Sequence, residues 1–188
     1  MPDPAGSPRD AAAFAAGLEA LAPRLVGWSH LRLRGRAGID PDDLAQEVVC
    51  RALAGRDRFA GSDLAAWVFQ IARHVLMEWL RSRQRRSQLG LGEGHGSQFD
   101  LDDVTARLTT LTRKIAQRDD IARLLAMAQQ LDAIDHVLLL SCGLEGVAPA
   151  AAAAQVGLAE EAARKRWYRL RQRLQAAATV LVADPGDD

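Results

Sequence analysis

Basic side chains gather on one short segment near the end of the chain, EAARKRWYRLRQRLQ at residues 161–175. Six arginine and lysine residues fall there with no acid between them, whereas the whole chain of 188 residues has 24 basic and 24 acidic side chains. Cationic side chains at this density on a helix can neutralise phosphates and reach base edges in the DNA major groove. The segment therefore indicates local nucleic-acid contact, and the neutral total argues against a protein that coats nucleic acid generally.

The basic segment follows a helix and a glycine, in the stretch PAAAAAQVGLAEEAARKRWYRLRQRLQ. Gly157 can take a left-handed turn conformation without steric cost, and Ala153 is small enough for two helices to cross there. This pattern predicts a helix-turn-helix whose second helix lies in the major groove. We expect Leu170 and Leu174 to anchor that helix to a core. A solvated surface helix with a positive face is the simpler alternative.

A second polar pattern lies in DPDDLAQEVVCRAL, residues 40–53. Asp40 fits a helix N-cap and Pro41 fits the first turn, so a helix is predicted to start here. At 100° per residue its apolar side chains share one face. The opposite, polar face is expected to meet solvent or a partner and carries Asp43, Gln46, Glu47, Cys50 and Arg51.

Apolar residues at helical spacing predict two further helices around this element. Phe14 belongs to a short helix that Pro23 is expected to interrupt, and Pro23 should open a second helix because proline is tolerated in a first turn. Ser62 is expected to cap a long helix that ends in a run of arginines. Trp67 and Trp79 fall at helical spacing on it and are interpreted as core residues.

The remaining sequence predicts a break followed by more helices. Four glycines in SQLGLGEGHGSQFD predict a linker, and residues 104–115 have the spacing of an extra amphipathic helix. Asp132 is expected to cap a helix, and Pro149 is expected to open the alanine-rich helix that leads to the basic segment. No strand-like alternation occurs. The sequence therefore predicts an all-α fold of two small helical domains joined by a flexible linker.

Composition narrows the class of protein further. Hydrophobic residues make up 48% and charged residues 26%, which is typical of a packed, soluble chain. Cys50 and Cys142 have neither metal-ligand spacing nor the pattern of a disulfide framework, which fits a reducing cytosol. No apolar run approaches the roughly 18 residues needed to cross a bilayer. We expect a cytoplasmic protein without metal, cofactor or membrane insertion, and the lack of a nucleophile–base pair or phosphate loop indicates that it is not an enzyme.

Three motifs occur in one order: DDLAQE, then RFAGSDLAAWVFQIARHVLMEWLRSRQRR, then the glycine turn with the basic segment. Together they resemble the small two-domain extracytoplasmic-function group of bacterial RNA polymerase sigma factors, over roughly residues 24–86 and 121–178. The resemblance implies four segments: an N-terminal tail and short helix at 1–23, a region 2-like helical domain at 24–86, a linker with an extra helix at 87–120, and a region 4-like helix-turn-helix domain at 121–183.

The resemblance implies binding roles for the first domain. It implies that Asp43, Gln46 and Glu47 dock on the clamp helices of the core polymerase. It also implies that the loop Arg56–Ser62 and the following helix open the minus-ten promoter element. A flipped base needs a pocket with a basic surface for its phosphates. The residues implied for pocket and backbone contact are Arg58, Phe59, Gly61, Ser62, Arg73, His74, Arg81 and Arg83.

The second domain is implied to bind the minus-thirty-five element, through Arg164, Lys165, Arg166, Tyr168, Arg169 and Arg173. This chain departs from the family pattern at several positions. His74 stands where the family has Asn, Ala159 stands where a Ser or Thr caps the recognition helix, and Ala152 stands where a large aliphatic residue packs. Either Trp167 and Tyr168 fill the resulting space, or the helix-turn-helix is only marginally stable off DNA.

The resemblance implies core RNA polymerase and promoter DNA as partners, and an anti-sigma protein as a regulator that no residue here identifies. Two other classes of function remain open from the residues. A stand-alone helix-turn-helix regulator would explain residues 148–178 but leave DDLAQE without a role. A helical adaptor that binds only proteins would place the basic helix against an acidic partner, and would show no steep salt dependence on promoter DNA.

Overall fold

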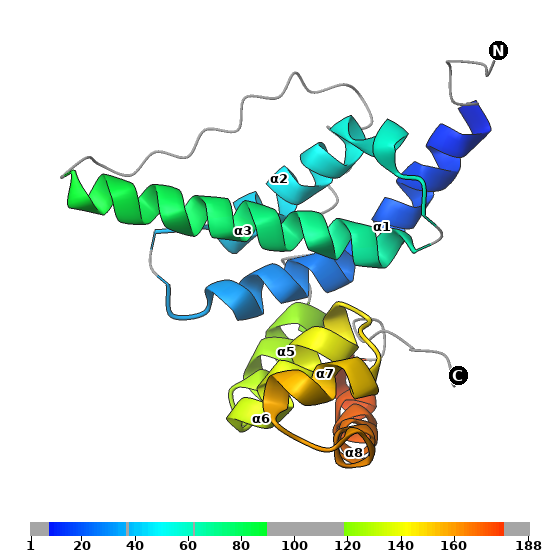
Figure 1. The fold of residues 1–188 in the computed structure, drawn as a ribbon, viewed down its shortest axis with the longest axis vertical. Helices are drawn as coiled ribbons and strands as arrows, with labels where there is room; N and C mark the ends of the chain where they lie inside the picture. Colours follow the sequence, from blue (N-terminus) through cyan, green and yellow to red (C-terminus); the bar gives the residue numbers. More distant parts are fainter. Residues whose placement is uncertain (1–7, 37, 62, 90–118, 179–188) are drawn as a thin grey trace.

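The described part of the chain is built from helices alone (Figure 1). The computed structural model describes residues 8–36, 38–61, 63–89 and 119–178, and no strand occurs in those ranges, which confirms the predicted all-α class. The extra helix predicted at 104–115 lies outside them. The elements are α1 (Pro8–Leu33), α2 (Pro41–Ala54), η1 (Arg56–Arg58), α3 (Leu64–Gln88), α5 (Asp119–Ala128), α6 (Ala133–Leu138), η2 (Leu139–Leu144), α7 (Pro149–Val156) and α8 (Glu160–Ala178).

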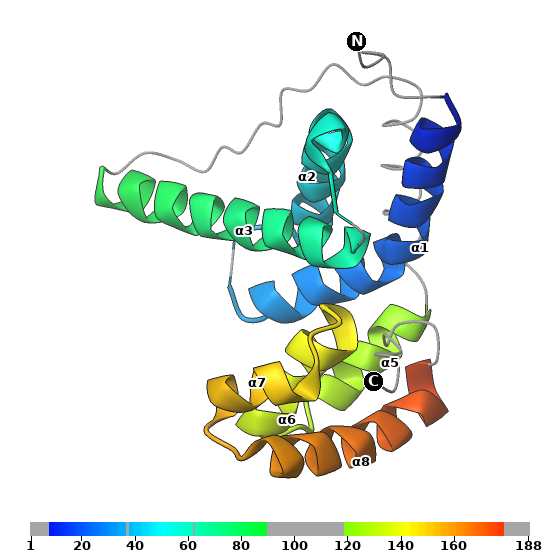
Figure 2. The same ribbon diagram turned by 45° about the vertical axis from the view of Figure 1, so that its right-hand side comes forward.

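The first helix does not break where the sequence predicted. We expected Pro23 to separate two helices, but α1 continues through it from Pro8 to Leu33. Proline removes one helical hydrogen bond and crowds the preceding turn, which bends a helix when packing holds both sides in place. Leu18 and Leu25, on either side of Pro23, are both buried, and Figure 2 shows α1 changing direction along its length.

Helix α2 forms as its sequence predicts. The Asp40 carboxylate caps it by accepting a hydrogen bond from the Asp42 N–H at 2.8 Å, and Pro41 occupies the first turn. The apolar face that the 100° spacing predicted is buried along its whole length. This face packs against α1 and α3 and consists of Leu44, Ala45, Val48, Val49 and Ala52.

The start of α3 differs from the prediction by one residue. The N-cap is Asp63, whose carboxylate accepts a hydrogen bond from the Ala66 N–H at 2.9 Å, and not the predicted Ser62. A carboxylate and a hydroxyl both serve as N-caps, so the sequence could not choose between neighbouring candidates. The interpretation of Trp67 and Trp79 as core holds in part, because both are half-buried and pack against the apolar core.

Residues 119–178, called the second half below, form a helical cluster of their own. The Asp132 carboxylate caps α6 by accepting from the Asp135 N–H at 2.9 Å, as predicted. Gly157 ends α7 with φ +65°, the left-handed conformation expected of it. The predicted anchors of α8, Leu170 and Leu174, are both buried.

Two small residues and one aromatic ring set the packing beneath α8. Ala152 and Ala153 are buried on α7, where this helix contacts α8. Trp167 is 3% exposed and its ring reaches Gly143, where an added Cβ would lie 3.0 Å from it. Tyr168 is 61% exposed. Of the two residues expected to fill the space left by small alanines, only Trp167 is in the core.

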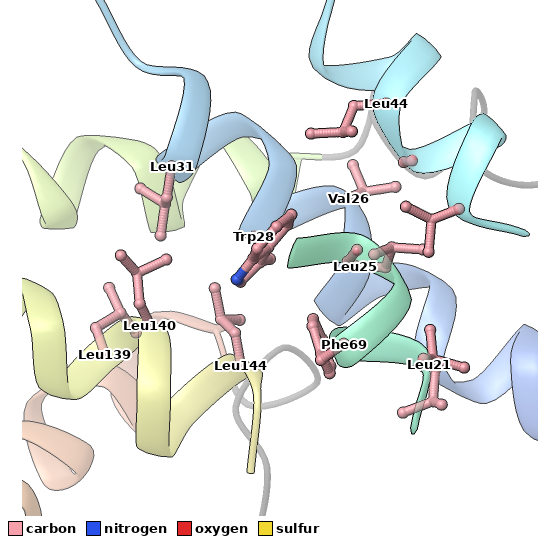
Figure 3. Packing of buried hydrophobic residues seen from close by; sticks show 14 of the residues in the cluster. Leu21, Leu25, Val26, Trp28, Leu31, Leu44, Phe69, Leu139, Leu140 and Leu144 are labelled. Atoms are coloured by element: carbon pink, nitrogen blue, oxygen red, sulfur yellow. The ribbon is translucent and has the colours of Figure 1, made fainter. Parts of the chain in front are cut away.

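Helix α1 packs on both halves of the molecule. Residues 8–89 are called the first half below. Within it, α2 and α3 pack against one side of α1, whereas α5 and η2 of the second half contact the other side of α1 (Figures 1 and 2). Figure 3 shows Trp28 and Leu31 of α1 in one apolar cluster with Leu144 of η2 and Phe69 of α3. The described residues thus share one connected core. None of the described helices has the length and apolar character to span a bilayer.

Candidate nucleic-acid and polymerase interfaces

The polar face of α2 is only partly open to solvent. Asp43 is exposed, but Glu47 and Cys50 are each 6% exposed, so the polar face meets solvent at Asp43 and is covered at Glu47 and Cys50. The Glu47 Oε1 atom lies 2.7 Å from Arg51 Nε, and Arg51 Nη1 lies 2.6 Å from Glu78 Oε2 on α3. The hydrogen bond between Arg51 and Glu78 raises the pKa of Arg51 and lowers the pKa of Glu78. Arg51 thereby links α2 to α3, because it pairs with Glu47 on α2 and with Glu78 on α3.

A cavity of about 460 Å³ lies where the first turns of α1 meet the loop before α3. Phe59, which the resemblance implied as part of a base pocket, is one of its lining residues. Gly61 lies beside that ring, because a Cβ added to it would be 3.6 Å from Phe59 Cε2. Arg58 is exposed and is not among the lining residues, and Ser62 lies outside the described residues. The cavity is lined by Ala11, Ala13, Phe14, Arg56, Asp57, Phe59 and Leu64.

Two aromatic rings line this cavity, and a third packs against both of them. The ring centroids of Phe59 and Trp67 lie 5.4 Å apart, and Phe14 lies 5.9 Å from Phe59 and 6.0 Å from Trp67. Such tilted and edge-on pairs stabilise one another beyond their buried area. Sequence reasoning missed Phe14 as a wall of the cavity, since its helical spacing indicated only a core position. Arg56 and Asp57 were included only as part of the loop and not as lining residues, but both line the cavity.

The basic residues of α3 start at Arg73, nine positions after Leu64, the α3 residue that lines the cavity. His74 and Arg81 are exposed, and Arg83 is half-buried, so the predicted backbone contacts lie on or near the surface. Arg73 is different, because its Nη1 atom donates to Glu145 Oε2 at 2.5 Å. One predicted DNA contact is therefore held by a residue of the second half.

The basic helix α8 carries exposed cations together with one that is tightly paired. Arg166 donates from Nε to Asp135 Oδ1 at 2.6 Å and from Nη2 to Asp132. These bonds raise the pKa of Arg166, and the pKa of Asp132 is lowered, chiefly by the Asp135 N–H and also by Arg166. The other predicted contacts are all exposed: Arg164, Lys165, Tyr168, Arg169 and Arg173.

Two of those exposed cations also have acidic neighbours. Lys165 Nζ lies 2.6 Å from Glu161 Oε1 one turn earlier on α8, and Arg173 Nη1 lies 3.8 Å from Asp135 Oδ2. Exposed ion pairs of this kind contribute little to stability. Sequence reasoning named the arginines but missed Asp132 and Asp135 as their partners. Asp132 was identified only as a helix cap.

Glu145 is a polar residue in the apolar interface that sequence reasoning did not single out. It is 6% exposed, and its Oε1 atom accepts hydrogen bonds from Trp28 Nε1 at 2.7 Å and from Arg32 Nη2 at 2.9 Å. Nearby, burial and Glu145 raise the pKa of the Cys142 thiol to about 12. Among the described residues no group of His, Cys, Asp and Glu side chains is arranged to hold a metal ion.

Comparison with known protein families places the first half in a defined domain family. Residues 18–86 match the Sigma-70 region 2 family. This range begins within α1 and ends near the end of α3, so it contains α2, the loop with Phe59 and the basic side of α3. No solved structure matches the chain significantly.

Comparison with curated proteins extends the similarity to most of the chain. It is 30% identical over 161 residues to the ECF RNA polymerase sigma factor SigF of Caulobacter vibrioides, covering 85% of this chain and 82% of that protein. It is also 30% identical over 148 residues to the ECF RNA polymerase sigma factor EcfG of Rhodopseudomonas palustris, covering 78% of this chain and 74% of that protein. The chain belongs to the ECF family of RNA polymerase sigma factors, which direct transcription initiation.

Proposed function

We propose that this sigma factor docks on core RNA polymerase through α2 and binds two promoter elements, the minus-ten element through the first half and the minus-thirty-five element through α8. The observation that carries the proposal is the cavity lined by Phe14 and Phe59 at the start of α3, a helix that carries exposed basic side chains further along. A hollow of this kind next to cationic side chains suits a base taken out of the stack while its backbone remains bound.

The minus-ten contact is proposed to combine stacking with hydrogen bonding. Phe59 and Phe14 supply apolar ring surface, and Asp57 and Arg56 supply an acceptor and a donor at the edge of the cavity. A carboxylate can accept from the amino group of a flipped base, and an arginine can bind either base acceptors or phosphate. His74 and Arg81, both exposed on α3, are proposed to contact the DNA backbone.

The minus-thirty-five contact is proposed to depend on the exposed cations of α8. Arg164 and Arg169 reach solvent and can neutralise phosphates when the helix enters the major groove. Arg166 points toward Asp132 and Asp135, so a base contact by Arg166 requires it to exchange these carboxylates for a guanine. Recognition by Arg166 is therefore a competition between two sets of acceptors.

The polymerase contact is proposed to centre on Asp43, with Gln46 beside it on the same turn of α2. Glu47 is proposed to contribute indirectly. It pairs with Arg51, which also pairs with Glu78 of α3, and these two ion pairs hold α2 and α3 together. The chain is proposed to act by binding alone, without a chemical step of its own, and to work in the cytoplasm where its polymerase is. An anti-sigma protein is proposed as its regulator.

The polymerase contact is tested by charge reversal at the exposed acid. Asp43→Lys should abolish co-purification with core RNA polymerase, because it replaces an exposed carboxylate on the docking face with a cation. Helix content by circular dichroism should not change. Glu161→Lys, an equal reversal at an exposed position on α8, is the matched control and should still bind core enzyme. Wild-type levels of core polymerase bound to a folded Asp43→Lys variant would rule out this face.

A further inference from the structure

We propose that the first turns of α1, residues 11–17, form a size-selective wall of the cavity and so help to decide which minus-ten base this chain accepts. The inference rests on the minus-ten function proposed above and deepens it, because it assigns part of the base selection to a segment outside the Sigma-70 region 2 match. Its evidence is the way in which α1 and the loop before α3 share the lining of the cavity.

The lining residues come from two segments that lie far apart in the sequence. Those within the family match, which covers residues 18–86, are Arg56, Asp57, Phe59 and Leu64. Those that precede it are Ala11, Ala13 and Phe14, all on α1. The family pattern therefore accounts for only one part of the cavity, and the other part comes from a segment that this pattern does not describe.

Close packing holds the first turns of α1 against the loop and α3. The Phe14 ring contacts both Phe59 and Trp67, with the ring centroids 5.9 and 6.0 Å apart. One turn later, a Cβ atom added to Gly17 would lie 2.6 Å from Leu64 Cδ2. The missing side chain at Gly17 thus lets α1 approach the start of α3, and the two helices meet there in Figures 1 and 2. The α1 wall therefore has a defined position at the cavity.

The loop and α1 supply different chemistry to the cavity. Arg56 and Asp57 of the loop bring charged groups, and the Arg56 Nε atom lies 3.5 Å from Asp57 Oδ1. Both side chains are exposed, so their hydrogen-bonding groups can reach the edge of a base. Alanine and phenylalanine have no side-chain hydrogen-bond donor or acceptor. The α1 residues therefore act on a base only through its shape and its apolar surface.

Ring packing limits where a base can lie in this cavity. The planes of Phe14 and Phe59 are tilted by 58° at a centroid distance of 5.9 Å, which is the spacing of two rings in direct contact. A base therefore packs against this pair and not between its rings. Beside Phe14, the lining positions Ala11 and Ala13 add only methyl groups. Their small size leaves space that a two-ring purine needs more than a one-ring pyrimidine does, and a pocket can discriminate between ligands by such differences in volume.

Ala13 is the position at which this size limit is best tested. It lines the cavity and is exposed, so Ala13→Leu fills space in the cavity without displacing a core residue. Alanine and leucine are both strong helix formers, so α1 should remain helical. Ala11→Leu, at the other small lining position, is a second variant that should act in the same direction. Ala12→Leu adds the same side chain at an exposed α1 position that does not line the cavity, and it serves as the matched control.

The measurement is the affinity of holoenzyme for single-stranded minus-ten oligonucleotides in which each position in turn carries one of the four bases or an abasic site. The position whose base enters the cavity is the one at which Phe59→Ala weakens DNA with a base but not abasic DNA. At that position Ala13→Leu should weaken purine DNA about tenfold more than pyrimidine DNA. With an abasic site there, Ala13→Leu and the wild type should bind alike, because no base meets the wall. Ala12→Leu should match the wild type on every oligonucleotide.

Two sets of outcomes separate this inference from the function on which it rests. An unchanged ratio of purine to pyrimidine affinity in folded Ala13→Leu and Ala11→Leu chains would overturn the α1 wall, as would an equal loss on abasic DNA or in Ala12→Leu. The minus-ten function would stand in each of these cases, provided that Phe59→Ala still changes base preference at one position. A Phe59→Ala chain with unchanged preference at every position would contradict the minus-ten function and the α1 wall together.

Discussion

The loop before α3 and the helix α8 both carry proposed DNA contacts, but packed aromatic rings shape the first and paired charges shape the second. Around the loop, Phe14, Phe59 and Trp67 pack against one another, and Phe14 and Phe59 line a cavity together with Arg56 and Asp57. On α8, Arg166 is held by two carboxylates of the same half. If both proposed sites bind DNA, the first needs no exchange of ion pairs to receive a base, whereas at the second Arg166 must exchange partners before it can bind.

The largest effect is expected from removing a wall of the preformed site. Phe59→Ala should weaken binding of single-stranded minus-ten DNA by holoenzyme by about 1–3 kcal/mol, the usual contribution of a base stacked on an aromatic ring. It should also reduce base preference at one position. Phe14→Ala should act in the same direction, although Phe14 lies outside the Sigma-70 region 2 match. The measurement is fluorescence anisotropy of labelled oligonucleotides with each base varied.

A matched control is available on the same helix as the basic side chains. Met77 is 46% exposed on α3 and does not line the cavity, so Met77→Ala should leave affinity and preference unchanged. Equal losses in Met77→Ala and Phe59→Ala, or an unchanged base preference in Phe59→Ala, would mean that the cavity does not hold a base.

An effect of similar size is expected on α8. Arg166→Ala should weaken minus-thirty-five binding by about 1–3 kcal/mol and relax preference at one base pair if this side chain reaches a guanine. Arg173→Ala should weaken all sequences alike and lower the log–log salt slope by about one unit, as loss of a phosphate contact does. Binding of holoenzyme to upstream-element DNA across a salt series measures both. Unchanged affinity and slope in both variants would favour the protein-adaptor function.

Local patterns explain why much of the fold could be predicted from the sequence. The caps Asp40 and Asp132 and the left-handed Gly157 depend on hydrogen bonds and steric limits within a few residues, and the structure has all three as expected. The apolar face of α2 follows from helical spacing. The break at Pro23 was predicted wrongly, because packing on both sides of the proline overrode its local preference.

The candidate sites were less predictable, because their partners come from distant parts of the chain. Arg166 finds Asp135 across 31 positions, and Trp28 finds Glu145 across 117. Phe14 meets Phe59 only because α1 and the loop before α3 fold together. Residue types and spacing predicted which side chains could contact DNA. Residue types and spacing did not indicate which of these side chains would already be hydrogen-bonded to another residue of the protein.

The smallest predicted effect is a gain, and it tests the exchange of partners directly. Asp132→Asn retains a good N-cap but removes a negative charge from Arg166, so minus-thirty-five binding should tighten severalfold. The gain should vanish in an Arg166→Ala background. Glu161→Gln removes one charge from α8 without freeing Arg166, so its effect should not depend on Arg166. Additive effects of Asp132→Asn and Arg166→Ala in this double-mutant cycle would contradict the exchange.

Run-off transcription with core RNA polymerase and a genomic promoter pool tests the central claim, that two separately built regions of one chain select promoters. We predict transcripts that require this chain, whose start sites share both an upstream and a minus-ten sequence. Phe59→Ala should reduce base preference only in the minus-ten sequence, and Arg166→Ala should reduce it only in the upstream sequence. Transcripts no different from those of core enzyme alone, or start sites that share neither sequence, would contradict the account.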